Sequence, residues 1–127
     1  MKISVVISLP DVVYGPLALL SGSLEEKLRK AAGLGCQGVE LMARDPAKLD
    51  SAAIAAALQR HGLEVSQVVT GELFGVDGLG LVTSEEELAA RSLQRGKEVV
   101  DFAARWGALV NIGRFRGRLD WVKGQAD

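Results

Sequence analysis

Four short, mostly apolar runs rich in β-branched residues recur along the chain, at residues 3–8, 38–42, 65–70 and 109–113. Their apolar residues are nearly continuous rather than alternating, which is typical of parallel strands covered on both faces. The segments between these runs have the apolar spacing of amphipathic helices. The pattern therefore predicts the element order β-α-β-α-β-α-β.

The first two predicted helices have clear start signals. The first begins at Ser23, and Glu26 follows three residues later, which is the spacing of a capping box. The second covers residues 51–61, with Asp50 as its N-cap and a glycine directly after it as its stop signal. Both helices are expected to pack small and aliphatic side chains on the sheet.

The third predicted helix begins at Ser84, where Glu87 completes a second capping box. It is the longest of the three and is expected to stop at Gly107, a residue type that readily ends a helix. The fourth strand follows it almost at once.

The connections between these elements are asymmetric. Links that follow helices are short, whereas links that follow strands are long, at residues 9–22 and 71–83. Ligand sites of parallel α/β folds gather at the carboxyl ends of the strands, so the long loops predict the functional face. The glycine-containing but apolar loop at residues 71–83 has two interpretations: a lid that closes over a small polar substrate, or a loop packed against a missing part of the fold.

Two architectures fit a repeated βα pattern: an open doubly wound sheet and a closed (β/α)8 barrel. No covering helix is predicted after the fourth strand, and the sequence has 127 residues. A barrel needs about 250 residues. We therefore expect one incomplete domain, residues 1–127, with an α/β fold that forms half of a TIM barrel and is truncated after its fourth strand.

Composition narrows the class of protein. Hydrophobic residues make up 48% and charged residues 24%, as in ordinary globular domains, which excludes disorder and a disulfide scaffold. The net charge of −1 gives no field that would attract nucleic acid or anionic lipid. With one cysteine and no apolar run near the roughly 20 residues that cross a bilayer, we expect a cytoplasmic protein without nucleic-acid or membrane partners.

With strands and loops laid out, the sequence resembles the N-terminal half of the xylose-isomerase-like TIM-barrel superfamily. This group contains sugar and sugar-phosphate isomerases and epimerases, hydroxypyruvate isomerases and AP endonucleases of the endonuclease IV type. The resemblance spans nearly the whole chain, and its order and spacing make it more specific than any single piece. The matching segments are GCQGVEL at residues 35–41, HGLEV at 61–65, Arg91 followed by VVDFAARWGA at 99–108, and VNIG at 110–113.

The resemblance implies carbohydrate metabolism with a divalent metal, Mn, Mg, Co or Zn, for the full-length family. In that family the metal is held by Glu, Asp and His side chains from the second half of the barrel, so we expect no metal to be bound by this chain. The endonuclease branch also uses histidines at the ends of early strands. The third and fourth strands of this sequence end without a histidine, which disfavours a DNA-repair function.

Five residues are predicted to contact a substrate, although no catalytic residue is assigned. The resemblance implies that Glu40 points into the barrel, and a carboxylate in so apolar a strand needs a partner or a raised pKa. Thr70 and Glu72 stand at the end of the third strand, and Asn111 and Arg114 stand at or near the end of the fourth. The alternatives are a structural carboxylate for Glu40 and a solvated basic loop for Arg114.

The only histidine and the only cysteine, His61 and Cys36, are assigned structural roles, because both lie on the rim opposite the predicted site. Tyr14, in the first long loop, is a weak candidate for stacking on a sugar.

Three functions remain open at this stage. The first is the N-terminal portion of a metal-dependent sugar or sugar-phosphate isomerase or epimerase, which is inactive alone and supplies substrate contacts and a lid. The second is a non-enzymatic α/β module that oligomerises through its open sheet edges, because proteins seldom leave such edges bare. The third is an AP-endonuclease-like metal phosphodiesterase. We expect a homo-oligomer whose small-molecule ligand is a sugar or sugar phosphate.

Overall fold

A computed structural model describes residues 1–13 and 20–124, so Tyr14 and part of the first long loop lie outside the described residues. The strands are β1 (Ser4–Ser8), β2 (Gly38–Met42), β3 (Glu64–Val69) and β4 (Leu109–Asn111). The α-helices are α1 (Leu24–Gly33), α2 (Ser51–Arg60), α3 (Gly71–Gly75) and α4 (Glu86–Ala104), and the 3-10 helices are η2 (Pro46–Lys48), η3 (Gly113–Arg116) and η4 (Leu119–Trp121).

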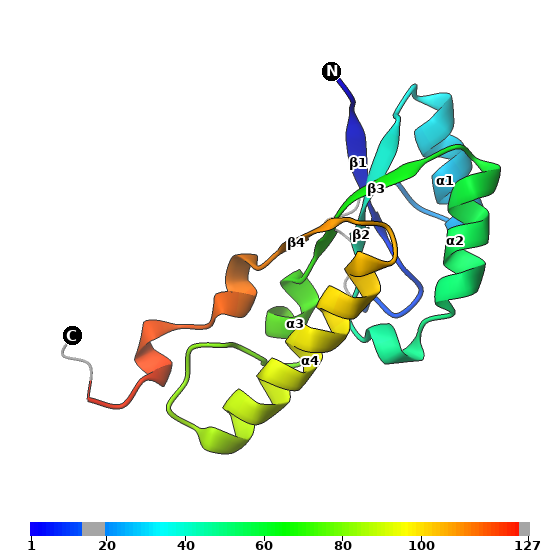
Figure 1. Ribbon diagram of the computed structural model, residues 1–127. Helices are drawn as coiled ribbons and strands as arrows, with labels where there is room; N and C mark the ends of the chain where they lie inside the picture. Colours follow the sequence, from blue (N-terminus) through cyan, green and yellow to red (C-terminus); the bar gives the residue numbers. More distant parts are fainter. Residues whose placement is uncertain (14–19, 125–127) are drawn as a thin grey trace.

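The four strands form one parallel sheet in the order β1-β2-β3-β4 (Figure 1). The order follows the sequence without a reversal, so the sheet lacks the switch point of a doubly wound fold. Helices α1, α2 and α4 contribute Leu28, Ile54 and Phe102 to one core with Val39 and Val68 of the sheet, so these helices cover the same face. The predicted parallel α/β fold is confirmed, and the sequential order is that of a half βα barrel.

The other face of the sheet, which we call the open face, has a mixed row of side chains in register. Val6, Glu40 and Gln67 are aligned partners on β1, β2 and β3, and Leu109 is the partner of Gln67 on β4. Successive side chains of a strand point to opposite faces, so Glu40 lies on the face opposite its buried neighbour Val39. Glu40 is only partly buried, which lets this carboxylate remain in an otherwise apolar strand.

The first two predicted helix starts are confirmed, and the third is wrong. The Ser23 side chain accepts from the Glu26 N–H, and the Glu26 side chain accepts from the Ser23 N–H. Helix α4 begins at Glu86, two residues later than predicted, without a side-chain cap. The Ser84 hydroxyl instead accepts a hydrogen bond from the Lys123 N–H at 2.8 Å. A contact with the chain's C-terminal segment therefore replaces the predicted cap.

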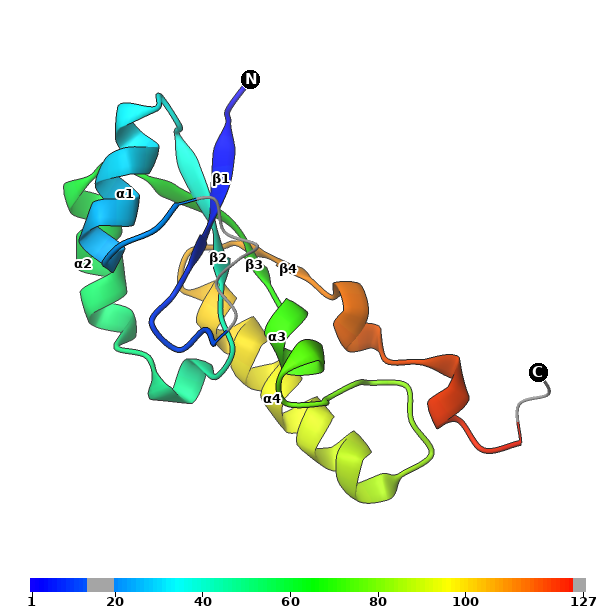
Figure 2. The ribbon, with the colours of Figure 1, turned by 180° about the vertical axis from the view of Figure 1, so that it is seen from behind.

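The predicted long loop at residues 71–83 is partly helical, since it contains α3, and it lies against the C-terminal segment. The Leu81 N–H donates to the carbonyl oxygen of Phe115 at 3.0 Å, and the Val82 N–H donates to that of Arg116 at 2.8 Å. The rings of Phe74 and Trp121 stack with their centroids 5.4 Å apart. Figure 2 shows this unit of α3, α4 and the C-terminal segment extending away from α1 and α2. The apolar side chains of the loop are thus covered within the chain.

The fourth strand is shorter than predicted, because Gly113 begins η3 instead of ending the strand. Within the described residues, no helix combines the length and the apolar character that crossing a membrane requires.

Candidate functional site

Charged side chains gather at the carboxyl ends of the strands in a group that we call the carboxyl-edge cluster. Arg44, which follows β2, donates to Asp77, which follows α3, with Nη2 2.8 Å and Nε 3.1 Å from Oδ1. From α4, Arg95 Nη1 lies 3.3 Å from Asp77 Oδ2 and also donates to the Arg44 carbonyl oxygen at 2.8 Å. Arg95 further approaches Asp45 at 3.6 Å and Glu98 at 3.3 Å. The cluster thus joins the chain after β2, the chain after β3 and helix α4.

The members of this cluster stabilise one another in their charged forms. Burial raises the pKa of Asp77, but the hydrogen bonds and charges of Arg44 and Arg95 outweigh burial and hold that pKa below its ordinary value of 3.8. The hydrogen bond to Asp77 raises the pKa of Arg44. All these groups are therefore ionised at neutral pH, and the arginines are held in fixed orientations.

Asp11, which follows β1, fixes the backbone after β2. Its Oδ2 accepts hydrogen bonds from the N–H groups of Arg44 at 2.8 Å and Asp45 at 2.6 Å, while its buried Oδ1 has no partner in the described part of the chain. A pocket of about 280 Å3 lies here, lined by Asp11, Arg44, Asp45, Lys48 and apolar neighbours. The carboxylate therefore sets the path on which Arg44 reaches Asp77.

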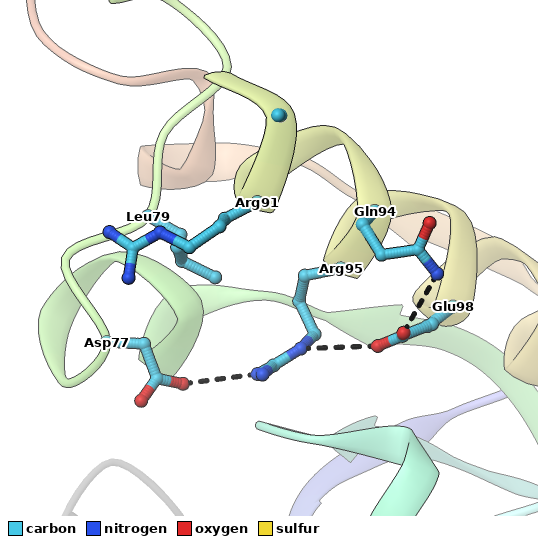
Figure 3. A pocket seen from close by; sticks show the side chains of 7 residues that line it. Asp77, Leu79, Arg91, Gln94, Arg95 and Glu98 are labelled. Carbon is cyan, nitrogen blue, oxygen red and sulfur yellow. Dashed lines mark hydrogen bonds and ion pairs between the residues drawn. The ribbon is translucent and has the colours of Figure 1, made fainter. Parts of the chain in front are cut away.

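A larger pocket of about 530 Å3 lies on the α4 side of the cluster (Figure 3). Arg91, Gln94 and Arg95 lie on neighbouring turns of α4, and residues three and four apart share a helix face. The exposed Arg91 makes no hydrogen bond or ion pair within residues 1–13 and 20–124, whereas Gln94 Nε2 donates to Glu98 Oε1 at 3.1 Å. The lining residues are Asp77, Leu79, Ala90, Arg91, Gln94, Arg95 and Glu98.

This lining suits a small polar anion that also has hydroxyl groups. Guanidinium groups bind phosphate and carboxylate oxygens, often through two parallel hydrogen bonds. The carboxylates of Asp77 and Glu98 and the side-chain oxygen of Gln94 are acceptors for hydroxyl protons. The volume falls within the range of about 300–1,000 Å3 that small-molecule pockets occupy.

The sequence-predicted contacts at the third strand have defined structural partners. Thr70 is 2% exposed, and its hydroxyl is 2.7 Å from the Asn111 carbonyl oxygen and 2.9 Å from that of Ile112. Glu72 is 5% exposed, and its Oε2 accepts from the Val13 N–H at 2.8 Å. Thr70 therefore joins the ends of β3 and β4, and Glu72 holds the chain after β1.

The other predicted contacts are accessible but do not converge. Asn111 and Arg114 are exposed, and the Arg114 guanidinium lies over the Phe74 ring, 5.4 Å from its centroid. Glu40 is on the open face of the sheet. Thr70 and Asn111 are brought together, but none of the five predicted residues lines the 530 Å3 pocket.

The carboxyl-edge cluster was missed by sequence reasoning, although one signal could have found part of it. The strand-end rule that singled out residues after the third and fourth strands applies equally to Asp11 after β1 and to Arg44 and Asp45 after β2. No local signal marks Arg95, because it is one of several charged residues along α4.

The far rim of the sheet contains His61 and Cys36, as predicted. The imidazole Nε2 of His61 lies 2.7 Å from Glu25 Oε2, which connects α2 to α1, and Cys36 packs partly buried against the core. In the described ranges, no three His, Cys, Asp or Glu side chains are placed to hold a metal ion together. These residues do not fit a metal centre, so no step proposed below passes through one.

No protein-family model matches the sequence, and no curated protein matches it. What the site binds is therefore inferred from its geometry and charge.

Proposed function

We propose that this chain is one half of a (β/α)8 barrel enzyme of the sugar or sugar-phosphate isomerase and epimerase type, to which it contributes substrate contacts. The sequential parallel sheet and the placement of α1, α2 and α4 on one face support half of a barrel. The open face, with Glu40 and Gln67 in one row, then corresponds to the barrel interior.

The observation that carries the ligand class is the 530 Å3 pocket, which places cationic and acceptor groups together at the carboxyl edge. Arg91 supplies a guanidinium with no partner in the described structure, and Arg95 supplies a second guanidinium that Asp77 and Glu98 hold in place. A phosphorylated sugar matches both halves of this lining, since its phosphate pairs with Arg91 and its hydroxyl groups donate to the acceptors.

The residues of this chain act in binding and orientation. Arg91 binds the phosphate, and Arg95 and Gln94 fix the direction of the sugar. Thr70 and Glu72 act as positioning residues through their contacts with the chains after β4 and β1. Glu40, Asn111 and Arg114 remain predicted substrate contacts, because each is at least partly accessible at the open face or the rim.

Ligand binding tests this proposal directly. Isothermal titration calorimetry and saturation-transfer NMR would compare a ketose phosphate with the same ketose lacking the phosphate. We expect binding of the phosphorylated sugar, weakened about tenfold by Arg91→Gln, which corresponds to about 1.4 kcal/mol. Arg29→Gln, at an exposed arginine of α1 outside the pocket, is the matched control and should bind like the unaltered chain. Equal binding of both sugars, or equal loss in both variants, would contradict the proposal.

Turnover by the chain alone is a separate measurement. We expect no isomerase activity on ketoses with added Mn²⁺ or Mg²⁺, because the proposal assigns the metal ligands to the other half of the barrel. Activity that persists through repurification would show that this division is wrong.

A further inference from the structure

The sheet has two edges that no strand covers within residues 1–13 and 20–124: the outer edge of β1 and the outer edge of β4. An edge strand exposes unpaired N–H and C=O groups, and parallel sheets are almost always covered on both faces. Both edges therefore offer backbone hydrogen bonds to a further parallel strand.

An apolar groove of about 270 Å3 lies beside the β4 edge. Its α4 side contains Leu93 and Val100, which are 54% and 53% exposed. Its other side contains Ile112, directly after β4, and the buried Phe115. Lys97 and Asp101 add polar groups to an otherwise apolar lining. We call this feature the α4 groove, and its shape and chemistry suit an amphipathic helix packed alongside α4.

We propose that the β4 edge and the α4 groove together receive the β1–α1 unit of a second copy of this chain. The two edges are complementary because β1 and β4 run in the same direction in one parallel sheet. Helices α1 and α4 cover the same face of that sheet. A second copy whose β1 extends the sheet at β4 therefore brings its α1 into the α4 groove without further adjustment.

Twofold symmetry completes this arrangement. If β4 of one copy pairs with β1 of the other, a twofold axis along the centre of the ring repeats the contact at the remaining pair of edges. Two four-stranded sheets then give a closed ring of eight parallel strands, the number found in a (β/α)8 barrel. The open faces of both sheets become its interior, and no edge is left bare.

An exposed apolar side chain at the end of α1 matches the groove. Leu34, which caps α1, is 71% exposed. Helices that connect parallel strands run opposite to the strands, so α1 of the second copy and α4 are parallel to each other. Leu34 of the second copy then lies beside the C-terminal half of α4, where Val100 is exposed. This contact does not depend on the sugar site.

The mass of the chain in solution tests the proposal. Light scattering coupled to size exclusion at micromolar concentration should give twice the 13.5 kDa chain mass. Val100→Glu, on an exposed side chain of the groove, should give the monomer mass with an unchanged circular dichroism spectrum. Leu119→Glu, at a side chain that is 72% exposed outside the groove, is the matched control and should remain a dimer. A monomeric unaltered chain, or a dimeric Val100→Glu variant, would overturn the proposal.

A mixing experiment tests the head-to-tail arrangement. Leu34→Lys should also be monomeric alone. An equimolar mixture of Leu34→Lys and Val100→Glu should associate, because one interface of the mixed pair is unaltered and the other places a lysine beside a glutamate. A groove-to-groove dimer predicts no such recovery, so a mixture that stays monomeric would reject the proposed arrangement. Sugar binding is measured separately, so its failure and the failure of this proposal are distinguishable.

Discussion

Arg44 and Asp77 belong to successive βα units and form a two-point ion pair at the carboxyl edge of the sheet, with 2.8 Å between Nη2 and Oδ1. Their side chains are only 30% and 20% exposed. Arg95 of α4 binds the same carboxylate from the other side. Because the pair is partly desolvated and joins separate segments, it contributes more to stability than an exposed ion pair does.

The first prediction concerns the dependence of stability on pH. The pKa of Asp77 is lower in the folded chain than in the unfolded chain, so its contribution is present above the unfolded value and is lost as the pH falls through the folded value. Denaturant unfolding at several pH values should show the free energy of unfolding decreasing below about pH 4. Asp77→Asn should flatten this decrease and cost about 2 kcal/mol at pH 7.

The control for this prediction is Glu64→Gln, which removes an ion pair with Lys2 whose side chains are 71% and 67% exposed. Exposed pairs contribute about 0–1 kcal/mol, so the variant should unfold nearly like the unaltered chain. A larger loss for Glu64→Gln than for Asp77→Asn would reverse the argument from burial.

The second prediction concerns Ser92, a fully buried polar residue of α4. Its hydroxyl oxygen accepts a hydrogen bond from the Gly80 N–H at 2.9 Å. Ser92→Ala should lower the free energy of unfolding by about 1–3 kcal/mol, because a buried N–H loses its partner. The exposed Ser21→Ala variant should be neutral by comparison, and equal melting temperatures of the two variants would contradict this role.

The third prediction separates two serines that look alike in the sequence. Ser23→Ala removes an observed N-cap and should cost about 1 kcal/mol with loss of helical stability in α1. Ser84→Ala should leave α4 intact and instead speed amide hydrogen exchange at Lys123, whose N–H donates to the Ser84 hydroxyl. Increased exchange across the first turn of α4 in the Ser84 variant would show that Ser84 caps that helix after all.

The fourth prediction concerns the close approach of Gly80 to the C-terminal segment. A β-carbon at Gly80 would lie 2.6 Å from Trp121 and 2.8 Å from the Gly117 backbone. Gly80→Ala should therefore displace this segment, which a shift of Trp121 fluorescence would report, and destabilise the chain. Gly33→Ala is the control, since its β-carbon would meet no atom within 4 Å in the described structure and alanine favours helix α1. An unchanged spectrum for Gly80→Ala would contradict this packing.

Local features of the fold follow from the sequence because their partners are close along the chain. The capping box of α1 involves Ser23 and Glu26, three residues apart, and the apolar run at residues 38–42 matches β2 without change. The prediction at Ser84 is wrong because its hydroxyl bonds to Lys123, 39 residues away. A capping pattern states which hydrogen bond is available locally, but it does not state which competitor arrives from elsewhere.

The sequence by itself determined the alternation of strands and helices and the edge where polar residues gather, because both depend on side-chain periodicity and loop length. Only the tertiary structure decided which of those polar residues meet. Arg44 and Asp77 are 33 residues apart, and Arg95 is a further 18 residues from Asp77. Their contact depends on the order of the strands and the position of α4, which packing of the whole core sets and no local pattern encodes.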